Sequence, residues 1–189
     1  GFIDQHIHGA GGSDAMDGAL KDLSIIAKTV AEEGTTGFLA TTMTQSKENI
    51  MNAMKAVKEY RETDKGEGAK VLGIHLEGPF IAAKHKGAQP LEYIAVPDIK
   101  TFEEYNTASG NCIKIVSLAP EADGAMELVS YLKDNGIVAS VGHSDSGYAQ
   151  IDEAIANGVS NVTHTYNAQT PLHHREIGVV GSALLRDEL

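Results

Sequence analysis

Six short apolar runs rich in β-branched residues recur along the chain, and segments with helical periodicity separate most of them. Glycine, proline, asparagine or aspartate bounds each run, as is typical of strands. We expect the strands at residues 2–9, 36–42, 70–77, 113–119, 138–143 and 161–164. Strands that alternate with helices indicate βαβ units, so the pattern predicts an α/β fold with a parallel sheet.

The intervening segments repeat apolar residues at the spacing of one helix face. Ala125, Leu128, Val129 and Leu132 fall at i, i+3, i+4 and i+7. Similar patterns occur at residues 25–34, 50–57 and 151–158, and a short helix is expected after Pro97-Asp98 within the long segment 80–110.

Polar side chains concentrate at the carboxyl ends of the expected strands. They are His6, His8, Thr41, Thr42, Glu77, Glu121, His143 and His164. A (β/α)₈ barrel keeps its active site at this end of its strands, and a doubly wound sheet also binds ligands there. Their location therefore predicts a site but leaves both architectures open.

The composition excludes several classes of protein. With 189 residues, one domain is expected, and a net charge of −11 argues against a nucleic-acid binder. No apolar run approaches the roughly 20 residues of a membrane span. Cys112 is the only cysteine, which rules out an intrachain disulfide and a cysteine-rich zinc site and is consistent with a reducing compartment. We expect Cys112 to be a small buried hydrophobe.

Three strand ends carry residues that bind metals. Glu77, His143 and His164 form a set typical of catalytic zinc or ferrous sites. Taken singly, Glu77 could be a salt-bridged core carboxylate, and each histidine could be a hydrogen-bonded core residue. His6 and His8 alternate on one strand and could meet a single cation, or they could be chance neighbours.

Two polar segments have less specific interpretations. Arg175 follows His173-His174 and could clamp an anion, or it could pair with Glu176 on an exposed loop. Residues 84–86, Lys-His-Lys, could form a cationic lip, although a solvated charge run is the simpler interpretation.

Seven short motifs occur in an order that resembles one family. They are Gly-Phe-Ile-Asp-x-His-x-His-Gly (1–9), Leu-Glu-Gly-Pro-Phe (76–80), Lys-Gly-Ala (86–88), Leu-Ala-Pro-Glu (118–121), Gly-His-Ser (142–144), Thr-His-x-x-Asn-Ala (163–168) and Pro-Leu-His-His-Arg-Glu (171–176). Together they resemble the N-acetylglucosamine-6-phosphate deacetylases of the amidohydrolase superfamily, over nearly the whole chain.

The resemblance implies a fold, an activity and a set of site residues. It implies a metal-dependent hydrolase with a (β/α)₈ barrel, of which residues 1–189 would hold about six of eight units, and a β-sandwich domain absent from this chain. It further implies a cytoplasmic homodimer that deacetylates N-acetylglucosamine 6-phosphate with zinc or iron. The implied residues are Glu77, His143 and His164 for the metal, Ala88 at the acetamido group, Asn167 and Ala168 near the sugar phosphate, and Arg175 on the phosphate.

The chain departs from this family pattern in two respects. Some members lack the His-x-His pair, so His6 and His8 allow a second metal here. The family's general acid/base Asp is expected beyond Leu189, so no catalytic residue is assigned within the chain, and residues 1–189 alone are expected to be inactive. Both ends look cut, with the C-terminal end apparently inside a helix.

Two alternatives remain open. The first is another amidohydrolase that cleaves a cyclic amide, although such enzymes usually carry a carboxylated lysine where Glu77 stands. The second is a metal- or sugar-phosphate-binding fragment without catalysis.

Overall fold

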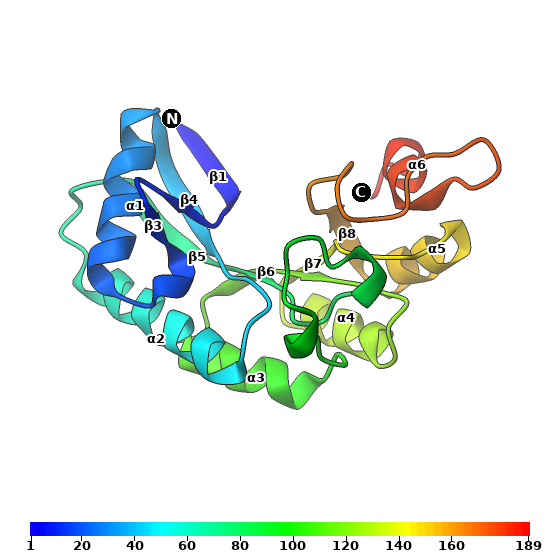
Figure 1. Ribbon diagram of the computed structural model, residues 1–189, viewed down its shortest axis with the longest axis horizontal. Coiled ribbons are helices and arrows are strands. Elements are labelled where there is room, and N and C mark those ends of the chain that lie inside the picture. The colour runs from blue at the N-terminus through cyan, green and yellow to red at the C-terminus, as the bar shows by residue number, and fades with distance from the viewer. The chain divides into compact units, whose positions relative to one another are not determined.

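The computed structural model describes residues 1–189 as an α/β fold with a six-stranded sheet, in the strand order β1-β4-β5-β6-β7-β8. The strands are β1 (Phe2–Ile7), β4 (Thr35–Thr41), β5 (Lys70–Glu77), β6 (Ile113–Leu118), β7 (Val138–Val141) and β8 (Val159–Val162). The described pairs β1–β4, β4–β5, β6–β7 and β7–β8 are all parallel. The predicted six strands and parallel sheet are therefore confirmed (Figure 1).

The chain divides into two compact units. The first comprises Gly1–Leu76 and Phe102–Lys114, and the second comprises Glu77–Thr101 and Ile115–Leu189.

None of the helices is long and apolar enough to cross a membrane.

In the first unit, α1 (Leu20–Glu32) packs against β4 and against α2 (Lys47–Thr63). The predicted face of α2 is confirmed, because Ile50, Ala53, Met54 and Val57 are fully buried. The predicted face of α1 is partly wrong, since Ile25 is exposed and Leu23 and Ala27 are buried instead.

A small hairpin in the first unit was not predicted. Its strands are β2 (Gly9–Ala10) and β3 (Ser13–Asp14), and Gly11 and Gly12 between them both have positive φ. A two-residue turn that needs positive φ twice is one that glycine makes readily. Asp14 and Asp17 then form a capping box on the 3₁₀ turn η1 (Ala15–Asp17).

In the second unit, α4 (Ala125–Asp134) packs on β7, and α5 (Tyr148–Asn157) packs on α4 and β8 (Figure 1). Ala125, Leu128, Val129 and Leu132 are fully buried, as their spacing predicts. The segment after β5 holds two 3₁₀ turns, η2 (Ala83–His85) and η3 (Leu91–Tyr93). The predicted short helix after Asp98 is α3 (Ile99–Ala108), which continues into the first unit.

Several strand ends and the C-terminal helix differ from the expected ones; the strand predicted at residues 138–143, for example, ends at Val141. The last strand was predicted at residues 161–164, but β8 ends at Val162 and leaves His164 in the following turn. Helix α6 (Gly178–Leu185) was not predicted from periodicity, because it is apolar on all sides and shows no helical alternation. It ends four residues before Leu189, so the expectation of a chain end inside a helix is wrong.

Candidate metal centre

Glu77, His143 and His164 lie together in the second unit. Glu77 is the last residue of β5, and each histidine follows its strand, β7 or β8, by two residues. Oε1 of Glu77 lies 3.2 Å from Nε2 of His143 and 3.0 Å from Nε2 of His164, and the two Nε2 atoms are 3.2 Å apart. Glu77 and His143 are buried, whereas His164 is partly exposed. Three potential ligand atoms therefore converge on one point.

A backbone carbonyl sets the tautomer of His143. Its Nδ1 lies 2.8 Å from the carbonyl oxygen of His85, which can only accept, so Nδ1 carries a proton. When Nδ1 alone is protonated, the lone pair lies on Nε2, which faces the carboxylate of Glu77. Two lone pairs at this distance require a proton or a cation between them.

The spacing of the three atoms fits a divalent cation. Ligands about 2.0–2.2 Å from a tetrahedral zinc ion lie about 3.3–3.6 Å from one another, close to the spacing in this group. Two neutral imidazoles and one carboxylate also leave a fourth position open, as in catalytic zinc sites. The donor set therefore fits a metal ion.

Gln89 is a site residue that the sequence analysis missed. Its side chain is buried, and its amide nitrogen donates to Oε2 of Glu77 at 3.0 Å. Metal-binding carboxylates are commonly held by such hydrogen bonds. A glutamine 12 residues after Glu77 in an irregular segment carries no sequence signal of this role.

The backbone at the two histidines is unusual. The φ angles are 52° at His143 and 35° at His164, and 53° at Ala168. Non-glycine residues with positive φ are uncommon and tend to occur at functional sites, where the surrounding structure holds them. Three of the four such residues in this chain are thus ones that the resemblance implicates, the fourth being Asn111.

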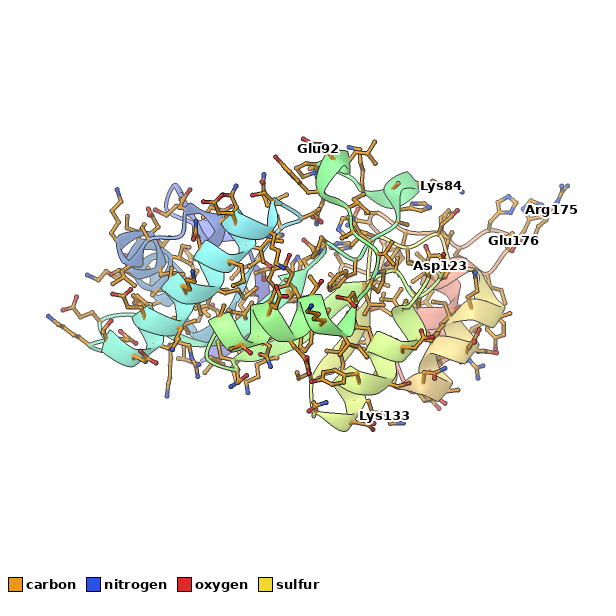
Figure 2. All side chains as sticks on the ribbon, turned by 90° about the horizontal axis from the view of Figure 1, so that it is seen from below. Lys84, Glu92, Asp123, Lys133, Arg175 and Glu176 are labelled. Carbon is orange, nitrogen blue, oxygen red and sulfur yellow. The ribbon has the colours of Figure 1, made fainter.

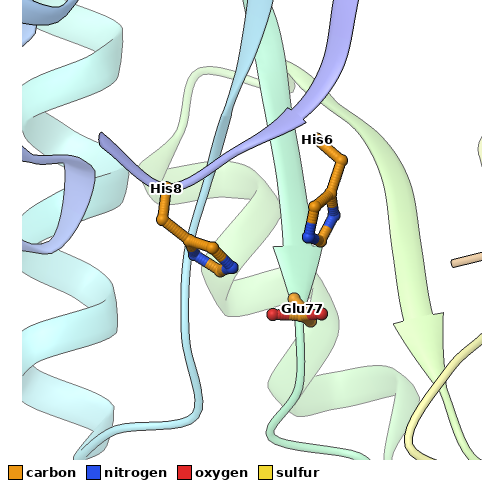
Figure 3. Close-up of side chains that lie close together, drawn as sticks. All are labelled: His6, His8 and Glu77. Atoms are coloured by element: carbon orange, nitrogen blue, oxygen red, sulfur yellow. The ribbon is translucent and has the colours of Figure 1, made fainter. Parts of the chain in front are cut away.

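His6 and His8 form a second group with Glu77 (Figure 3). His6 lies near the end of β1, His8 follows that strand, and Glu77 ends β5. One ligand atom from each of the three residues lies within 4.8 Å of the others. Nδ1 of His6 is also 3.4 Å from Nδ1 of His75, which lies 2.9 Å from the carbonyl oxygen of Gln5.

The expected substrate residues fall into two sets. Gly87 lies close to the ring of His143 and to Ala168: a Cβ atom added to Gly87 would lie 3.7 Å from the nearest atom of His143 and 3.8 Å from that of Ala168. Ala88, the next residue, is exposed. Ala88, Asn167 and Ala168 therefore belong to loops beside the metal group. Arg175 is exposed on an extended loop and points away from the helices in Figure 2. No ion pair joins it to Glu176.

The charged segment at residues 84–86 is more structured than a solvated run. Nζ of Lys84 lies 2.8 and 2.9 Å from the two carboxylate oxygens of Asp145, and Nε2 of His85 lies 2.9 Å from Oδ1 of the same residue. The hydrogen bonds from Lys84 and then His85 lower the pKa of the Asp145 carboxyl. The interpretation of residues 84–86 as a solvated charge run is therefore incomplete. Lys84 is exposed (Figure 2), but it forms an ion pair with Asp145.

Known proteins resemble this chain over its full length. It is 48% identical to the N-acetylglucosamine-6-phosphate deacetylase of Bacillus subtilis, covering 99% of this chain and 48% of the relative. It is 44% identical to the enzyme of the same name from Lysinibacillus sphaericus, covering 100% of this chain and 49% of the relative. An N-acetylgalactosamine-6-phosphate deacetylase of Escherichia coli O157:H7 is 37% identical over 97% of this chain and 48% of the relative. No family model matches the chain.

Solved structures agree with the sequence comparisons. The N-acetylglucosamine-6-phosphate deacetylase of Thermotoga maritima superposes with a TM-score of 0.88 at 35% identity, covering all of this chain and 49% of that one. A variant of the Mycobacterium smegmatis enzyme, solved with N-acetyl-D-glucosamine-6-phosphate, gives a TM-score of 0.91 at 28% identity, covering 100% and 48%. The chain spans about half the length of the curated relatives it matches. In sequence and fold, it is thus homologous over its whole length to about half of an N-acetylglucosamine-6-phosphate deacetylase.

Proposed function

We propose that this chain carries the metal-binding part of a hydrolase that deacetylates N-acetylglucosamine 6-phosphate. The convergence of Glu77, His143 and His164 is the observation that carries this proposal. The names of the relatives supply the reaction and the substrate class. The six strands, which pair in chain order, support a (β/α)₈ barrel. The homodimer and the cytoplasmic location stay predictions from the resemblance.

In the proposed mechanism, Glu77, His143 and His164 hold one divalent cation, zinc or iron. When bound, the cation polarises the acetamido carbonyl and makes water a better nucleophile near neutral pH. His143 offers Nε2 because the His85 carbonyl keeps the proton on Nδ1. Gln89 keeps the Glu77 carboxylate oriented through the hydrogen bond to Oε2. His6 and His8 would hold a second cation.

The loops beside the metal group would orient the substrate. Gly87, which precedes Ala88, lies close to the ring of His143 and to Ala168, and an acetamido group would approach there. Arg175 would bind the phosphate with its guanidinium, which matches phosphate oxygens in a bidentate manner. Because Arg175 is exposed at a loop tip, this contact requires the loop to reach the bound sugar phosphate.

The test is acetate release by the full-length, metal-loaded protein from N-acetylglucosamine 6-phosphate, its galactosamine epimer and unphosphorylated N-acetylglucosamine. We expect kcat/KM to be highest for the first. Arg175→Ala should lower kcat/KM about 10–150-fold for the phosphorylated sugars, the typical effect of a lost charge-assisted hydrogen bond, and leave the unphosphorylated sugar almost unaffected. Equal losses on all three substrates would show that Arg175 is structural, and absence of acetate release would refute the proposed reaction.

A further inference from the structure

The loop after β7, Ser144–Ser146, lies behind the candidate ligand His143 and is tied to a carboxylate on a different loop. Glu121 follows β6, and its Oε2 accepts hydrogen bonds from the hydroxyls of Ser144 at 2.8 Å and Ser146 at 2.7 Å. Its Oε1 accepts the backbone N–H of Asp145. Both serines are fully buried. One carboxylate therefore satisfies three consecutive donors directly after His143.

The same loop is tied to the segment that sets the His143 tautomer. Asp145 binds Lys84 and His85 through its side chain, and the His85 carbonyl accepts the Nδ1 proton of His143. The backbone N–H of Ala82 also donates to the His143 carbonyl at 2.8 Å. Hydrogen bonds thus connect Glu121 to residues 144–146, the side chain of Asp145 to His85, and the carbonyl of His85 to the ring of His143.

These hydrogen bonds explain how His143 keeps a strained backbone conformation. A non-glycine residue at φ 52° persists only where its surroundings over-determine it. The three hydrogen bonds to Glu121 and the two links to residues 82–85 supply that constraint on both sides of the residue.

We propose that Glu121 is a positioning residue for the metal site: it holds the loop Ser144–Ser146 in the conformation that aims Nε2 of His143 at the cation. This inference rests on the proposed metal site, but the hydrogen bond from Nδ1 of His143 to the His85 carbonyl can be measured without metal. Glu121 itself touches none of the three ligand side chains through its carboxylate; its described partners are Ser144, Asp145 and Ser146.

The first test is zinc affinity of the full-length protein by competition with a chelator, for Glu121→Gln and the control Glu153→Gln. Glutamine has one acceptor oxygen where the carboxylate has two, so it cannot satisfy all three donors. Glu153 is exposed on α5 and serves as the matched control. We expect Glu121→Gln to weaken zinc binding about 10–100-fold, the usual effect of losing a partner that orients a ligand, and the control to bind like the parent protein.

A second test separates positioning from general stability. In metal-free protein, the hydrogen bond from Nδ1 of His143 to the His85 carbonyl should protect the Nδ1 proton from exchange with water, as measured by ¹H–¹⁵N NMR of the imidazole. Glu121→Gln should speed this exchange while the fold stays intact by circular dichroism. Parent-like zinc affinity with unchanged exchange in a folded variant would overturn the inference. If the parent protein binds no zinc, the proposed function fails, and the exchange measurement alone still decides the role of Glu121.

Discussion

The two candidate metal groups obtain their histidines in different ways. His6 lies in β1 and His8 directly follows it, and neither residue has a positive φ. His143 and His164 lie beyond the ends of β7 and β8, with left-handed backbone, and His143 is held by hydrogen bonds from residues 82–85 and, through the residues that follow it, from Glu121. The first pair lies in and directly after a strand whose register with β4 shifts between Asp4 and Ile7. His143 is therefore the histidine whose strained backbone is maintained by hydrogen bonds between loops.

The largest expected effect comes from the residue that both groups share. Glu77→Gln removes the only carboxylate in either group, so the charge that balances a divalent cation is lost. We expect the metal-to-protein ratio by elemental analysis to fall close to zero, a weakening beyond the about 10–100-fold that an orienting partner causes. Glu153→Gln should keep the parent ratio. Full metal content in Glu77→Gln would contradict both metal sites.

The next effect separates the two groups. His143→Ala should remove the metal held by Glu77, His143 and His164, because only two of its three ligands remain. The double substitution His6→Ala with His8→Ala should leave that metal in place and abolish only a second equivalent. Zinc titration by calorimetry gives the stoichiometry of each variant. If the double substitution instead removes the first equivalent, His6 and His8 belong to the principal site and the comparison is reversed.

The smallest effect tests the backbone difference directly. At His143, glycine should be more stable than alanine by about 1–2 kcal/mol, because an L-residue with positive φ is strained. At His6, glycine should be less stable than alanine by about 0.5–1 kcal/mol, because His6 has no positive φ and glycine loses more conformational freedom on folding. Urea unfolding of the four metal-free variants measures both differences. The same sign at both positions would show that the His143 backbone is not strained in solution.

Much of the fold follows from local sequence patterns. The faces of α2 and α4 match their apolar spacing, and the strands end close to the polar residues that mark them. The prediction is wrong where tertiary burial replaces periodicity, as at Ile25 on α1 and in α6. It also places His164 in the last strand, whereas the residue lies in the turn beyond β8.

The site shows the same division. The residue types at strand ends are enough to select Glu77, His143 and His164, because parallel strands bring their carboxyl ends to one edge of the sheet. The supporting residues carry no such mark: Ser144, next to His143, binds Glu121, and Thr163, next to His164, binds Ser117 and Ser140. The partner of His143 is a backbone carbonyl, which every residue carries and no motif can mark.

The sequence by itself determined the six main strands, the helices between them and the polar side chains near the strand ends, because these features depend on local propensity and on the period of apolar residues. Only the tertiary structure decided how the histidine rings are aimed. That orientation arises from hydrogen bonds between loops far apart in the chain, such as those from residues 144–146 to Glu121, and it overrides the local preference of the backbone at His143.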